Sequence, residues 1–130
     1  MIKKILFCLM LGSNLYSEGT VNVIEIMQHL EYSTSLILKG FLHNQRPLID
    51  EGREKLKKSL IELKGVNPKV YLPLHKRNLE VVIFNNFARM DEQLELMGEY
   101  LNKKEMNRAY NAFDRILNGC FKCHAVVRGW

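Results

Sequence analysis

The segment Cys120-Phe121-Lys122-Cys123-His124 constrains this chain more than any other feature of its sequence. Two cysteines separated by two residues and followed at once by a histidine form the pattern of covalent c-type haem attachment. Each thiol can add to one vinyl group of the porphyrin, and the adjacent imidazole can then bind the iron. We therefore expect one covalent haem c, with Cys120 and Cys123 as thioether anchors and His124 as the proximal iron ligand.

Two other uses of a cysteine pair are weaker interpretations. A closed zinc site needs four N or S ligands, but the chain has no second cysteine pair, and His29, His43 and His75 are scattered along it. A thioredoxin-like redox pair belongs near a βαβ pattern, and this sequence has none. A small helical interaction module with a zinc or redox cysteine pair is the corresponding non-haem alternative.

The first 17 residues have the pattern of a secretory signal peptide. Lys3 and Lys4 precede an apolar run at residues 5–12, and a small, polar stretch follows up to Ser17. The run is shorter than the roughly 20 apolar residues that a membrane-spanning helix needs. We expect cleavage after Ser17, export to the periplasm and no stable membrane insertion afterwards. A retained anchor is the alternative.

Removal of this segment would leave a chain suited to one domain, residues 18–130. Cys8 would be lost with it, so the two motif cysteines would be the only ones left. The full chain has a formal net charge of +5. The excess is spread along the sequence, without a basic run interleaved with aromatic residues, so we expect no nucleic-acid partner.

The spacing of apolar residues predicts an all-α fold, because they recur at intervals of three and four and not two. We predict helices over about 20–43, 47–64 and 73–101, and a fourth from about 102 into the motif. Four helices with mostly short connections favour an antiparallel up-down-up-down bundle. In such a bundle the start of the first helix lies beside the end of the fourth, where the haem would be.

Local signals place the predicted helix ends. Asn22 with Glu25, and Asn102 with Glu105, have the form of capping boxes, which would begin the first and fourth helices. Pro47 suits the first position of the second helix.

Three of the helices have a regular apolar stripe that we expect to face the interior. The stripes are Val23, Met27, Leu30, Thr34, Ile37 and Phe41 in the first, Ile83, Phe87, Met90, Leu94, Met97 and Leu101 in the third, and Met106, Tyr110, Phe113 and Leu117 in the fourth. The last stripe continues onto Cys120 and then His124, so the motif is predicted to point into the bundle.

Met27 is the candidate sixth iron ligand, because it lies on the interior stripe close to the start of the first helix. Met/His ligation raises the reduction potential and suits an electron carrier. Alternatively, Met27 is a core residue that fills a gap, and Ile24, one turn earlier, would then lie over an open iron site. Arg128 is the candidate partner of a haem propionate, or simply a cation favoured at a helix C-terminus. His29, His43 and His75 are predicted at the surface.

The chain resembles the cytochrome c′ family, the class II c-type cytochromes. Its haem motif is near the C-terminus, Arg128 follows His124 by four residues, and residues 113–119 lead into the first motif cysteine as the family's last helix does. The resemblance covers residues 18–130 in architecture but only about 109–128 in specific sequence.

The resemblance implies a four-helix bundle with haem c held by Cys120, Cys123 and His124, and pairing into homodimers. Many members of the family are five-coordinate and bind NO or CO, whereas others have a methionine of the first helix as sixth ligand and carry electrons.

We therefore expect an exported c-type cytochrome that transfers single electrons between redox partner proteins. The alternative is a five-coordinate haem protein that binds NO or CO at an open distal site. We expect no enzyme, because the sequence shows no Ser/His/Asp constellation, Gly-rich phosphate loop or apposed carboxylates. Lys55, Lys57, Lys58 and Lys64 are predicted to form a solvated face, with guidance of an acidic redox partner as the alternative.

Overall fold

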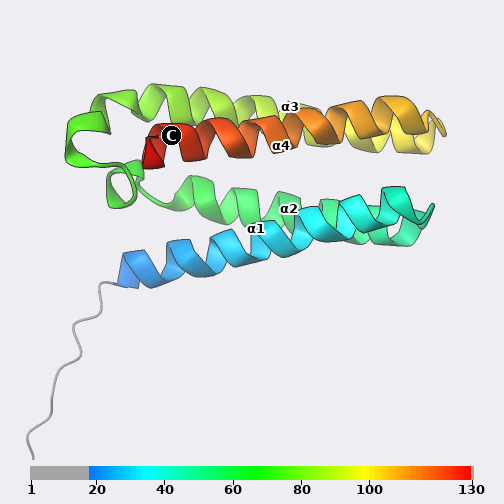
Figure 1. Ribbon diagram of the computed structural model, residues 1–130, viewed down its shortest axis with the longest axis horizontal. Coiled ribbons are helices and arrows are strands. Elements are labelled where there is room, and N and C mark those ends of the chain that lie inside the picture. The colour runs from blue at the N-terminus through cyan, green and yellow to red at the C-terminus, as the bar shows by residue number, and fades with distance from the viewer. Residues whose placement is uncertain (1–17, 130) are drawn as a thin grey trace, which may run out of the picture.

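The computed structural model describes residues 18–129, so the predicted signal peptide in residues 1–17 lies outside the described part of the chain. Four long helices pack together in it: α1 (Glu18–Leu42), α2 (Arg46–Gly65), α3 (Glu80–Asn102) and α4 (Met106–Arg128) (Figure 1). The described residues contain no strand. The predicted all-α class is confirmed.

The helices form two closely packed pairs, α1 with α2 and α3 with α4, which lie as two layers in Figure 1. Glycine permits the close approach in the first pair. A Cβ atom on Gly52 of α2 would lie 2.7 Å from Cγ1 and 2.9 Å from the backbone nitrogen of Ile37, and one on Gly40 of α1 would lie 2.5 Å from Cγ1 of Ile49. These distances are shorter than real Cβ contacts, so the two backbones meet where no side chain separates them.

The predicted interior stripe of α3 is confirmed. All six of its members are buried: Ile83, Phe87, Met90, Leu94, Met97 and Leu101. A regular heptad pattern was sufficient here because one continuous face of α3 packs against the other helices.

The predicted stripes of α1 and α4 are only partly correct. In α4, Phe113 is buried, but Tyr110 is 45% exposed and Leu117 is 36% exposed. The other buried residues of α4 lie beside the predicted stripe, and they are Ala109, Ala112, Ile116, Gly119 and Cys123. In α1, Leu30 and Ile37 of the predicted stripe are buried, as expected, but Val23, Met27 and Thr34 are only half-buried. Ile26 and Ser33, outside that stripe, are buried as well. Val23, Met27 and Thr34 line a space between α1 and α4. Phe41 of the same stripe instead contacts the rings of Tyr110 and Phe113 in α4.

Both predicted capping boxes are wrong. The chain is already helical at Glu18, so Asn22 lies inside α1. Glu105 is the N-cap residue of α4 without a side-chain cap bond, and Asn102 is the last residue of α3. The Oδ1 atom of Asn102 accepts a hydrogen bond from the guanidinium of Arg46 at 3.1 Å, so a contact with α2 replaces the predicted cap.

The predicted start of the third helix is also too early. Residues 68–79 form two 3-10 helices, η1 (Pro68–Val70) and η2 (Leu74–Leu79), and α3 begins at Glu80. Pro47 lies in the first turn of α2, but at its second position and not at the predicted first one, because α2 begins at Arg46.

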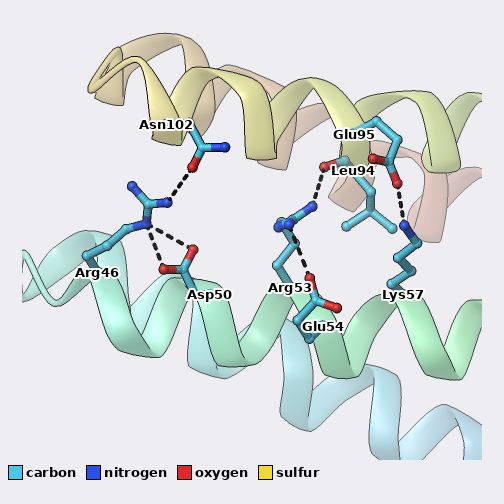
Figure 2. A network of polar contacts seen from close by, with 8 residues as sticks. All are labelled: Arg46, Asp50, Arg53, Glu54, Lys57, Leu94, Glu95 and Asn102. Atoms are coloured by element: carbon cyan, nitrogen blue, oxygen red, sulfur yellow. Dashed lines mark hydrogen bonds and ion pairs between the residues drawn. The ribbon is translucent and has the colours of Figure 1, made fainter.

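Polar side chains of α2 join it to α3 (Figure 2). Arg46 donates to the carbonyl oxygen of Leu101 at 2.6 Å, and the ammonium of Lys57 lies 2.6 Å from Oε1 of Glu95. The first residue of α2, Arg46, thus contacts the last turn of α3. The hydrogen bond from Lys57 lowers the pKa of Glu95 and raises the pKa of Lys57.

The four lysines considered as a docking face all have acidic partners. The pairs are Lys55 with Glu51, Lys57 with Glu95, Lys58 with Glu62, and Lys64 with Asp91. Exposed ion pairs of this kind add little stability. They do neutralise the lysines locally, which favours the solvated-face interpretation over the guidance of an acidic partner.

One end of the molecule holds the start of α1, the connection formed by residues 66–79 and the end of α4 (Figure 1). The connection contacts α4 directly, because Nζ of Lys76 donates to the carbonyl oxygen of Val126 at 2.8 Å. The Cys120–His124 segment is therefore near the end of the molecule where the connection of residues 66–79 lies. None of the described helices is long and apolar enough to cross a bilayer.

Candidate functional site

A groove of about 520 Å³ lies between α1 and α4, and side chains of α2 and α3 form its floor. Its volume is within the range of about 300–1,000 Å³ that small-molecule and cofactor sites have. The groove brings together every residue that the sequence proposed for haem binding: Ile24, Met27, Cys120, Cys123, His124 and Arg128. These residues come from opposite ends of the described chain, so their convergence is a property of the fold.

Aromatic packing joins α1 to α4 farther from the motif than the groove. The ring of Phe41 in α1 stacks on Phe113 of α4 with centroids 5.9 Å apart, and meets Tyr110 edge-on at 5.6 Å. Such pairs are favourable geometries for aromatic rings, and they join α1 to α4 below the groove. Toward the haem motif, α1 presents Met27 and Thr34 instead, and the space between the helices stays open.

The two cysteines are in an environment that suits an uncharged sulfur. Cys123 is buried, with 7% of its surface exposed, and Cys120 is half-buried. Burial raises the pKa of Cys120, and burial together with the nearby Cys120 raises the pKa of Cys123 to about 11. Zinc binds cysteine as the thiolate, whereas a thioether sulfur is neutral. The apolar surroundings suit a neutral sulfur atom, such as that of a thioether.

His124 is half-buried and lines the same groove as the cysteines. It follows Cys120 by four residues in a continuous helix, so the two side chains lie on one face of α4, one turn apart. A histidine in this place can present an imidazole to an iron ion held in the groove.

On the facing wall, Met27 lies deeper than Ile24. Met27 is half-buried at the groove and packs against the hydrophobic core, whereas Ile24 also lines the groove but is 57% exposed. The prediction that His29 faces away is confirmed, since it is exposed and lines a different cavity with Glu25 and Glu62. His43 and His75 are exposed, as predicted.

Arg128 is exposed and is the last residue of α4, at the rim of the groove. A carboxylate on a molecule held in the groove could meet this guanidinium while still in contact with water. Contact with a haem propionate stays a prediction.

The sequence analysis did not identify the residue of α3 that binds the backbone of α4 next to the motif. Asn86 of α3 is buried, and its Nδ2 atom donates to the carbonyl oxygen of Gly119 at 2.7 Å. The available signal was an asparagine beside the apolar stripe of α3, four residues before Met90, where a buried polar side chain needs a partner.

The groove offers side chains that could serve as axial ligands of a porphyrin iron. Within residues 18–129, no three His, Cys, Asp or Glu side chains are grouped so that they could hold a metal ion. A porphyrin supplies four nitrogen ligands itself, so its iron needs from the protein only axial ligands such as His and Met.

No protein-family model matches the chain, and no curated protein or solved structure matches it either.

Proposed function

We propose that the chain is an exported c-type cytochrome, which holds one haem c in the groove between α1 and α4 and transfers single electrons between redox partner proteins. The observation that supports this most is the groove itself. It places Cys120, Cys123 and His124 on one wall and Met27 on the facing wall. A cysteine pair placed for another purpose would not need a cavity of cofactor size with a thioether side chain opposite.

The proposal includes an antiparallel up-down-up-down order of the helices, as in the cytochrome c′ family that the chain resembles. Contacts along the helices support this order. Arg46 at the start of α2 meets Leu101 at the end of α3, whereas Lys64 at the end of α2 meets Asp91.

Each residue at the groove then has a specific role. Cys120 and Cys123 anchor the porphyrin through thioether bonds, His124 is the proximal iron ligand, and Met27 is the distal one. When bound, haem c supplies a one-electron iron couple, which is the chemistry of an electron carrier.

The rest of the groove is lined by buried apolar side chains. Leu30, Leu60, Leu63 and Phe87 are buried and line it. An apolar surrounding is one of the means by which a protein sets the potential of its haem. Arg128 at the rim would neutralise a propionate, at a position where both charges remain partly solvated.

The test is an absorption spectrum of the full chain, made in a host with haem-lyase machinery and measured oxidised, reduced, and reduced with CO. A low-spin, six-coordinate spectrum with slow CO binding supports electron transfer. A protein recovered without haem, or one whose haem is removed by acid and organic solvent, contradicts the proposal.

A second candidate function is the binding of NO or CO at an open distal site. It is favoured by one observation, that Ile24 lines the groove one turn from Met27. A haem bound one helical turn nearer the start of α1 would face Ile24, and the distal site would then be apolar and open.

Export, a periplasmic location and pairing into homodimers complete the proposal. Export depends on the signal pattern in residues 1–17, and cell fractionation of the full chain tests it. Homodimers follow from the resemblance to the family, and sedimentation of the haem-loaded protein tests them.

A further inference from the structure

The contact between Asn86 and Gly119 is a buried polar link between α3 and α4, directly behind the haem motif. Asn86 is 8% exposed, and its Nδ2 atom donates a hydrogen bond of 2.7 Å to the carbonyl oxygen of Gly119. A buried amide is costly unless it forms hydrogen bonds, so an apolar residue would be expected here if packing alone mattered. We propose that Asn86 is a positioning residue that sets the orientation of the haem-binding segment of α4, an inference that rests on the proposed function.

Gly119 brings α4 unusually close to α3 at this point. A Cβ atom on Gly119 would lie 2.5 Å from Cγ and 2.8 Å from Sδ of Met90. Both distances are shorter than real Cβ contacts, so Met90 occupies the space that any side chain at position 119 would need. Asn86 and Met90 together therefore form the contact surface of α3 on which the backbone of Gly119 packs.

This contact of Gly119 with Asn86 and Met90 lies next to the two cysteines of the motif. It immediately precedes Cys120, and in an α-helix its carbonyl oxygen is also the acceptor for the backbone N–H of Cys123. The amide of Asn86 therefore binds a carbonyl that belongs to the helical turn containing both cysteines. A rotation of α4 about its axis would break this contact and would turn Cys120 and His124 away from the groove together.

The same amide also reaches the wall of the groove. Nδ2 of Asn86 lies 3.9 Å from Sδ of Met90, and Met90 lines the groove together with Cys120 and Cys123. Asn86 itself does not line the groove. It acts through Gly119 and Met90, so we assign it a positioning role and not a ligand role.

The experiment compares Asn86→Leu with Ser59→Ala in the full chain, made with haem-lyase machinery. Leucine has the same number of side-chain heavy atoms and the same branching at Cγ as asparagine, but it is larger and cannot donate a hydrogen bond. Ser59 is a buried polar residue of α2 that does not line the groove, so its variant controls for the loss of any buried polar group. The measurements are covalent haem per protein, the reduction potential, and the iron–histidine stretching band of the reduced protein.

We expect Asn86→Leu to lower covalent haem per protein by about fivefold, the factor that corresponds to one hydrogen bond of ordinary net strength. The haem that is attached should show a shifted potential and a broader iron–histidine band, because His124 is no longer held in one orientation. Ser59→Ala should change none of the three.

A second pair of variants tests the same contact from α4. Gly119→Ala should change the three measurements as Asn86→Leu does, whereas Gly65→Ala should not, since a Cβ atom on Gly65 would meet nothing within 4 Å. If Asn86→Leu loads haem fully, with the potential and band of the unmutated protein, the positioning role is wrong while the proposed function stands. If the unmutated protein itself has no covalent haem, both are wrong.

Discussion

Lys76 donates a hydrogen bond from its ammonium group to the backbone carbonyl oxygen of Val126 at 2.8 Å. The last carbonyl groups of a helix have no partner within the helix, and a cation near them also interacts favourably with the helix dipole. Lys76 belongs to η2, and Val126 lies two residues after His124. The connection between α2 and α3 thus caps the helix that contains the haem motif.

Lys76→Met should therefore loosen the last turn of α4. We expect the free energy of unfolding to fall by about 1 kcal/mol, the net value of an ordinary hydrogen bond, and amide exchange to increase in residues 124–128. Lys69→Met is the matched control, because it removes the same charge from an exposed position of the same connection. Equal stability losses in the two variants would show that the contact with Val126 contributes nothing beyond charge.

The distal ligand is tested by Met27→Ala. If Met27 binds the iron, the unmutated ferric protein should show the weak near-infrared band of sulfur-to-iron charge transfer, and CO should bind slowly. Met27→Ala should then give a high-spin protein that binds CO and NO readily, whereas Ile24→Ala should keep the spectrum of the unmutated protein. An unmutated protein that is already high-spin and binds CO at once would favour gas binding, with Ile24 as the distal residue.

Parts of the fold and the site could be predicted because they depend on local spacing. The stripe of α3, from Ile83 to Leu101, was predicted correctly, since that helix has one continuous buried face. The groove-facing residues Met27, Cys120 and His124 were also identified from spacing alone.

Other features depend on contacts between distant segments, and spacing does not encode these. In α4, the face against α3 consists of small residues such as Ala112 and Gly119, which an apolar stripe of large residues does not reveal. Asn102 resembled a cap in sequence but binds Arg46 instead. Asn86 was missed because its partner, the backbone carbonyl of Gly119, has no sequence signal.

Gly52→Ala should destabilise the protein. Alanine normally favours a helix over glycine by about 1 kcal/mol, but a methyl group here would meet Ile37 and the carbonyl oxygen of Ser33, both within 3 Å. Overpacking of this kind costs about 1–3 kcal/mol, so we expect a net loss of stability in urea denaturation. Gly65→Ala is the control, with no loss expected because the added atom has no neighbour within 4 Å. A Gly52→Ala variant as stable as this control would contradict the close contact of α1 and α2.

Tyr71 should make the protein sensitive to alkali. Its hydroxyl oxygen is buried without a hydrogen-bond partner among the described residues. Burial, then the nearby Cys123 and Glu80, raise the pKa of Tyr71 from 10.0 to about 12. A raised folded-state pKa means that the folded protein holds this proton more tightly than the unfolded chain does. The stability that Tyr71 contributes is therefore complete below pH 10 and is lost as the pH rises through about 12.

Tyr71→Phe should remove this part of the alkaline loss, and at pH 7 it should be neutral or stabilising because it deletes an unpaired hydroxyl. Thioether formation at Cys123 would remove the contribution of that thiol to the raised pKa of Tyr71 and leave burial and Glu80 as its causes. The checks are a titration of tyrosinate absorbance and urea denaturation at each pH, with the exposed Tyr110→Phe as control. An alkaline loss that is the same in both variants would show that Tyr71 is not its source.

Covalent haem is the central claim, and the most direct test is extraction of the exported protein with acid and organic solvent, followed by haem staining of the denatured chain. We predict that haem stays with the unmutated chain, because Cys120 and Cys123 hold it through thioether bonds. The double variant Cys120→Ala, Cys123→Ala should retain none. Complete extraction of haem from the unmutated chain, or equal retention by the double variant, would contradict the account.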